Sequence, residues 1–102
     1  MTDRQFLRLN DRWALADDRL QWIIQRRGSI DKRSGKYRWY GESFISSNRD
    51  ILVLTLREKG IVPDPGKMEE VLALPYTFKE WIAPRQAEED AGARPSVMEE
   101  AA

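Results

Sequence analysis

The apolar residues of this chain change their spacing once, near Ser47, and this change limits the folds that the chain can adopt. Before Ser47 they fall on alternate positions, as Leu20, Trp22 and Ile24 do, which is the period of a strand with one buried face. After Ser47 they recur at helical spacing. Strands that all precede the helices are typical of the α+β class. We therefore predict a three-stranded antiparallel sheet over about residues 12–45, with Leu20, Trp22 and Ile24 in the core.

Turn residues divide the front half into its three strands. The strands cover about residues 12–16, 20–25 and 36–40. Asp17 and Asp18 supply turn chemistry between the first two, and a loop rich in Ser, Gly and charge at residues 28–35 separates the last two. The apolar phase shifts across Gly41, where we expect a bulge or the end of the strand.

Caps and stops divide the back half into two to three helices, which we expect to pack on one face of the sheet. The helices cover about residues 48–59, 65–74 and 78–83. Ser47 is the predicted cap of the first, and Asp64, before a first-turn proline, is the predicted cap of the second. Thr77 and Glu80 form a capping-box pattern for the third, which Pro84 is expected to end.

The folded part of the chain should be a single domain over residues 1–85. A chain of 102 residues that is 41% hydrophobic and has four Trp can bury one core without disulfides or a structural metal. From Gln86 onward the composition changes to Ala, Glu, Gly and Pro, with five acids against Arg94. We expect residues 86–102 to be an acidic, disordered C-terminal tail.

Catalytic chemistry has few residues to draw on here. The chain has no Cys and no His, which excludes a thiol nucleophile and the usual metal ligands and proton shuttle. Its glycines are scattered, so no phosphate-cradling loop is present. We predict no enzyme activity, no catalytic residues, no metal site and no cofactor. No apolar run approaches the length of a membrane span, so no membrane partner is expected.

The most informative segment is a basic hairpin over residues 26–40. It holds six bases against Asp31 alone, a local charge of +5 in a chain whose total charge is zero. The predicted partner-binding residues are its bases and two of its aromatics: Arg26, Arg27, Lys32, Arg33, Lys36, Tyr37, Arg38 and Tyr40. Bases neutralise phosphates and aromatics stack on unpaired bases, which suits nucleic acid. The same residue types dominate protein hot spots, which suits an acidic protein or nucleoprotein surface.

Two further readings of this charge pattern remain open. The bases can simply keep a protruding loop soluble and its strand edges charged. The acidic segment 86–102 can also fold back over the basic hairpin as an intramolecular competitor, in which case its deletion should strengthen binding.

A resemblance adds a biological setting. Four stretches carry it: Arg12-Trp13-Ala14-Leu15, Leu20-Gln21-Trp22-Ile23 with Arg26-Arg27, Ser43-Phe44 with Arg57-Glu58-Lys59-Gly60, and Leu74-Pro75 with Phe78 and Trp81. Across residues 12–82 the chain resembles small proteins of bacterial phages and mobile elements. The resemblance implies a cytoplasmic location in a bacterial host and brings no functional residue with it.

These observations favour a non-catalytic binding protein. By analogy with anti-CRISPR proteins, the first hypothesis is an inhibitor of a host defence system that occupies an acidic macromolecular surface. The alternative is a DNA- or RNA-binding module. The turn at residues 28–33 resembles that of the three-stranded DNA-binding domain of phage integrases, but no recombinase domain follows it. We expect a monomer or a small homo-oligomer.

Overall fold

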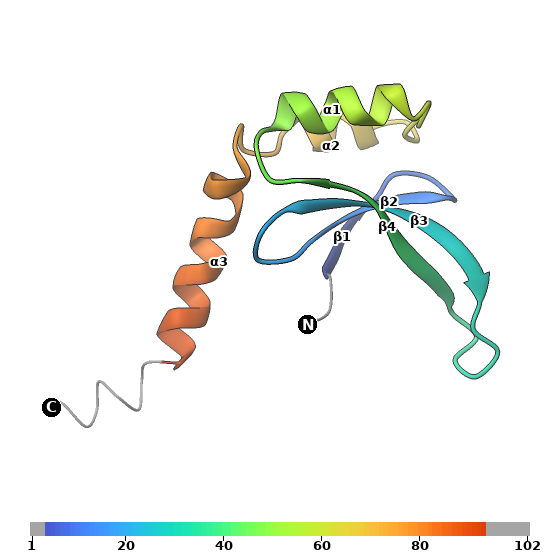
Figure 1. Cartoon of the computed structure of the whole chain (residues 1–102), viewed down its shortest axis with the longest axis horizontal. Helices are drawn as coiled ribbons and strands as arrows, with labels where there is room; N and C mark the ends of the chain where they lie inside the picture. The colour runs from blue at the N-terminus through green and yellow to red at the C-terminus, as the bar shows by residue number, and fades with distance from the viewer. Residues whose placement is uncertain (1–3, 94–102) are drawn as a thin grey trace, which may run out of the picture.

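The computed structural model describes the backbone of residues 4–93 and the side chains of residues 4–85. It contains a four-stranded antiparallel sheet followed by three helices (Figure 1), which confirms the α+β class. The strands are β1 (Arg4–Arg8), β2 (Trp13–Asp17), β3 (Trp22–Ile30) and β4 (Tyr37–Ile45), and they lie in the sheet in sequence order. The helices are α1 (Arg49–Glu58), α2 (Lys67–Leu72) and α3 (Phe78–Ala93).

The first strand, β1, was missing from the predicted sheet, and the count of three strands was therefore wrong. β1 pairs with β2, and the register shifts between Gln5 and Leu7. This irregularity breaks the alternation by which a strand is recognised in a sequence. The turn into β2 is built by Asn10, whose side-chain oxygen accepts hydrogen bonds from the backbone N–H groups of Arg12 and Trp13 at 2.8 and 2.9 Å.

The predicted hairpin is confirmed as β3 and β4, and both strands are longer than expected. The backbone of Asp31 closes its turn, donating to the Lys36 carbonyl at 2.7 Å and accepting from the Gly35 N–H at 2.8 Å. The bulge at Gly41 is also confirmed. Ile24 pairs with Ser43, whereas the next residue, Gln25, pairs with Gly41, so one extra residue is inserted in β4.

The core lies between one face of the sheet and the helices, with α1 and α2 on the same side of the sheet (Figure 1). The sheet contributes Leu7, Leu15, Trp22, Ile24 and Ile45, and the helices contribute Leu52, Leu56, Val71, Phe78 and Ile82. Trp22 and Ile24 are fully buried as predicted, but Leu20 is 72% exposed. Leu20 lies in the turn before β3 begins, so the alternation of the strand does not apply to it.

The predicted helices exist, but their ends differ. Asn48, not Ser47, caps α1, because its side chain accepts from the Ile51 N–H at 3.0 Å. Helix α2 begins at Lys67 instead of residue 65, since Gly66, with φ of 85°, occupies the N-cap position. Thr77 caps α3 as predicted, because its hydroxyl accepts from the Glu80 N–H at 3.2 Å, and the same hydroxyl donates to the Glu80 carboxylate at 2.8 Å.

The prediction that Pro84 ends the third helix was wrong. Helix α3 continues through Pro84 to Ala93. A proline inside a helix removes one backbone hydrogen bond, whereas the residues that follow, rich in Ala and Glu, have high helix propensity and favour continuation of the helix. Part of the expected acidic tail, residues 86–93, is therefore helical. The rest of that tail, residues 94–102, lies outside the described residues.

Candidate functional site

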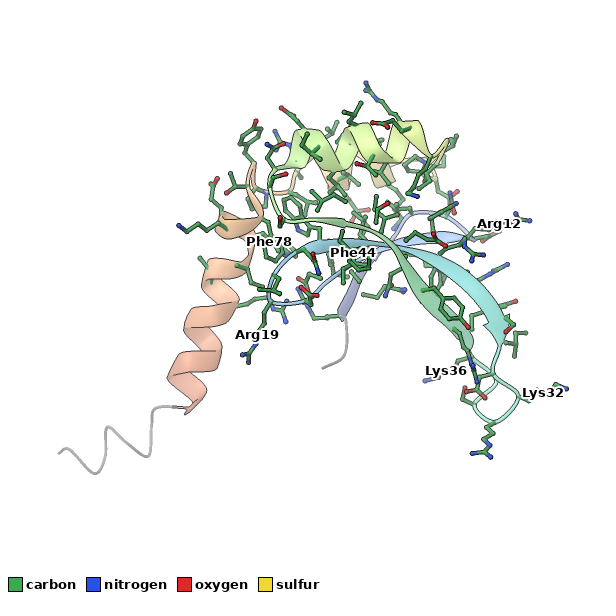
Figure 2. All side chains as sticks on the ribbon, viewed as in Figure 1. Arg12, Arg19, Lys32, Lys36, Phe44 and Phe78 are labelled. Atoms are coloured by element: carbon green, nitrogen blue, oxygen red, sulfur yellow. The ribbon has the colours of Figure 1, made fainter. Side chains whose placement is uncertain are left out.

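The basic hairpin projects from the body of the protein, and Figure 2 shows Lys32 and Lys36 at its tip. Every residue from Lys32 to Arg38 is exposed. Among the described side chains, none forms an ion pair with Lys32, Arg33 or Lys36. These three positive charges are therefore available to a partner.

Acids lie beside two of the other predicted bases. Arg26 donates to a Glu42 carboxylate oxygen at 2.6 Å, and this hydrogen bond lowers the pKa of Glu42. Arg38 lies 3.8 Å from an Asp31 carboxylate oxygen, at the limit of an ion pair. Glu42 falls just outside the segment 26–40, so a charge count over that segment overstates the free positive charge at the base of the hairpin.

The predicted aromatics lie on opposite faces of the hairpin. Tyr37 carries the Arg27 guanidinium over its ring, at 4.2 Å from the ring centroid. Tyr40 pairs with Arg26 across the sheet, and its ring occupies the space beside Gly28, where an added Cβ would clash with Tyr40 Cε2. Tyr37 is 42% exposed and Tyr40 is 45% exposed. A single flat partner surface therefore cannot cover both rings.

Two hollows mark the hairpin. One, of about 270 Å³, lies at its base and is lined by Arg12, Trp13, Arg26, Arg27 and Gly28. The other, of about 560 Å³, lies at its tip and is lined by Ser29, Ile30, Asp31, Lys32, Arg33 and Arg38. Arg12 was not among the predicted site residues. It reaches the hairpin because its carbonyl accepts the Arg27 N–H at 2.7 Å, a contact between strands that no local pattern reveals.

Elsewhere in the described part of the chain, the structure brings no group of three or more His, Cys, Asp or Glu residues together around a possible metal ion. The buried carboxylate of Asp17 is fully engaged by Arg4, Trp81 and Arg85, at 2.7 to 3.3 Å. No helix there is long and apolar enough to cross a membrane.

Comparison with known proteins found no match, whether among protein-family models, curated proteins or solved structures. The resemblance to phage proteins therefore gains no support from them. The function has to be argued from the hairpin itself.

Proposed function

We propose that this chain is a non-catalytic binding protein that contacts nucleic acid through its basic hairpin. The observation that carries the proposal is the set of three bases at the tip, Lys32, Arg33 and Lys36, which are exposed and have no ion pair among the described side chains. Charges needed only for solubility do not have to gather at the end of a projecting two-stranded ribbon, whereas phosphate-binding charges do.

The shape of the ribbon supports the same partner. A two-stranded ribbon fits the major groove of a duplex, and it also lies well along a single strand. Arg12, an exposed residue that lines the hollow at the hairpin base, adds a further positive charge on the side of the hairpin nearest the sheet. A phosphate backbone is a continuous row of negative charges, and bases at both the tip and the base of the hairpin complement it.

Salt dependence is the test. Each phosphate contact contributes about 0.9 to the slope of log affinity against log salt, so the three tip bases alone predict a loss of at least about 40-fold between about 50 and 200 mM salt. Mobility-shift titrations with DNA and RNA should show this loss for the wild type. The variant Lys32→Ala/Arg33→Ala/Lys36→Ala should bind more weakly at low salt, with a slope smaller by about 2.7.

The matched control removes one surface base from each of the three helices, Arg57→Ala/Lys67→Ala/Lys79→Ala. It changes the net charge equally and should bind like the wild type. Equal losses in both triple variants would mean that net charge, not the hairpin, drives binding. Absence of binding by the wild type at either salt concentration would refute the proposal.

A second candidate is the host-defence inhibitor, which would occupy an acidic protein surface in the cytoplasm of a bacterial host. Ile30, on the hairpin, is 51% exposed beside the charged tip, and apolar contact of this kind is more typical of a protein interface than of a phosphate backbone. In both cases the chain acts as a monomer or small homo-oligomer. A protein partner is the candidate that remains if no nucleic acid binds.

A further inference from the structure

The sheet has a second face, which the helices do not use. Strand alternation places Ala14, Ala16, Ile23 and Gln25 opposite the core residues of β2 and β3, and the core cluster contains none of the four. All four are nonetheless buried. We call the face that they form the open face. The two central strands, β2 and β3, contribute these small or buried side chains to the open face. Its exposed residues come from the edge strands, β1 and β4.

Phe44 is the most exposed aromatic residue of the described chain, at 56%, and it lies on the open face. It pairs with Ile23 across β3 and β4, and Figure 2 shows it on the side of the sheet away from α1. Its ring rests against Gly41, where an added Cβ would meet the Phe44 Cζ at 2.9 Å. The bulge glycine thus gives the ring its place on the sheet. No other aromatic ring or cation among the described residues contacts Phe44.

Two arginines lie on aromatic rings of the same face. The Arg27 guanidinium lies over Tyr37, and that of Arg8, from the opposite edge strand, lies 4.9 Å from the centroid of Trp39. Arg27 and Trp39 are register partners, so the two pairs are neighbours. A guanidinium group that stacks its flat face on an aromatic ring still has the N–H donors at its edge, and these can donate hydrogen bonds to other acceptors. Among the described residues, neither of these two side chains donates a hydrogen bond.

We infer that the open face binds single-stranded nucleic acid, with Phe44 stacking on an unpaired base and Arg8 and Arg27 holding phosphates. This inference rests on the proposed function and extends it from the hairpin tip onto the sheet. An exposed ring and oriented guanidinium groups on the same face of a sheet form the combination that single strands require. The bases of a duplex already stack on one another, so Phe44 has no base face to contact there. Charge complementarity and the exposed ring together select this ligand.

The test compares a labelled single strand of about 15 nucleotides with the duplex of the same sequence, by fluorescence anisotropy at fixed salt. Phe44→Ala should weaken single-strand binding by about 5- to 160-fold, the loss typical of one base stack, and leave duplex binding unchanged. Phe44→Leu should lose nearly as much, because it keeps apolar volume but has no aromatic face. Leu54→Ala is the matched control: Leu54 is 50% exposed on α1, far from the open face, and its loss should change neither affinity.

The outcomes separate this inference from the proposed function. If Phe44→Ala binds both ligands as the wild type does, or weakens both equally, the stacking role is refuted while hairpin binding stands. If the wild type binds duplex but no single strand, the inference fails and the proposed function survives. If the wild type binds neither ligand, the proposed function fails first. Unfolding curves of Phe44→Ala that match the wild type exclude a loss of fold.

Discussion

Asp17 shows how one residue joins distant parts of the chain. Its carboxylate is buried at the end of β2 and accepts hydrogen bonds from Arg4 in β1 and from Trp81 and Arg85 in α3. Burial alone would raise the pKa of Asp17, but the hydrogen bonds from Arg4, Trp81 and Arg85 outweigh it and the pKa is lowered. The ionised side chain at the end of β2 therefore holds both β1 and the first turns of α3 by hydrogen bonds.

The replacement Asp17→Asn should destabilise the protein by about 2 kcal/mol near neutral pH, a value kept low because Arg4 remains half-exposed to solvent. Because the folded-state pKa lies below the unfolded value of about 3.9, the ionic contribution is complete above that value and is lost as the pH falls through the folded pKa. Urea unfolding from pH 7 down to pH 2 should show the two proteins converging in stability below about pH 4. A constant difference across this range would contradict the assignment.

For Asp17 and Asp18, the sequence predicted only interactions with neighbouring residues in the chain. Asp17 and Asp18 were both assigned to a turn. For Asp18 this is confirmed, because its side chain accepts from the Leu20 and Gln21 N–H groups. The partners of Asp17 are 13, 64 and 68 residues away, so its role depends on packing that no short pattern encodes.

At the scale of elements, start and stop signals were reliable for the existence of helices and less so for their first residues. Both Ser47 and Asn48 have side chains suited to cap α1. Asn48 takes the role because it also pairs with Thr77 in an isolated bridge that fixes its extended backbone. The capping residue was thus decided by a tertiary contact.

Exchanging each candidate cap for alanine tests this assignment. Asn48→Ala should lower the free energy of unfolding by about 1 kcal/mol, because the Ile51 N–H loses its acceptor. In a domain of this size that corresponds to a fall in Tm of about 4 to 8 °C. Ser47→Ala, in the neighbouring position, should change Tm by less than about 2 °C, since surface substitutions seldom exceed about 0.5 kcal/mol. Calorimetry gives the Tm of both variants. A larger fall in Tm for Ser47→Ala than for Asn48→Ala would mean that Ser47, not Asn48, caps α1.

Across the whole molecule, the two ends differ in charge. The tip of the β3–β4 hairpin lies at one end, and the far part of α3 lies at the other (Figure 1). The basic segment was visible in the sequence because its charges are contiguous. The Arg8–Trp39 and Arg26–Glu42 contacts were not, because they depend on β1 and on the register set by the bulge at Gly41.

This arrangement bears on the idea that the acidic segment 86–102 competes with nucleic acid for the hairpin. Three of its five acids, Glu88, Glu89 and Asp90, belong to α3, which extends away from the hairpin with the sheet between them (Figure 1). Trp22, at the start of β3, packs against Phe78 at the start of α3, whereas the other end of β3 lies at the hairpin turn. The nine residues of β3, at about 3.3 Å each, span roughly 30 Å, several times the Debye length of about 8 Å at physiological salt. Over that separation these charges should have little effect on the hairpin.

We therefore expect Glu88→Gln/Glu89→Gln/Asp90→Asn to change nucleic-acid affinity by less than about twofold at physiological salt. The single change Glu42→Gln should strengthen binding more than these three together, because it removes the negative charge that neutralises Arg26 from 2.6 Å away, within the predicted site. Titrations of both variants against one oligonucleotide make the comparison direct. A tenfold gain from the α3 variant would instead mean that the acidic segment does reach the hairpin, and that binding is regulated from within the chain.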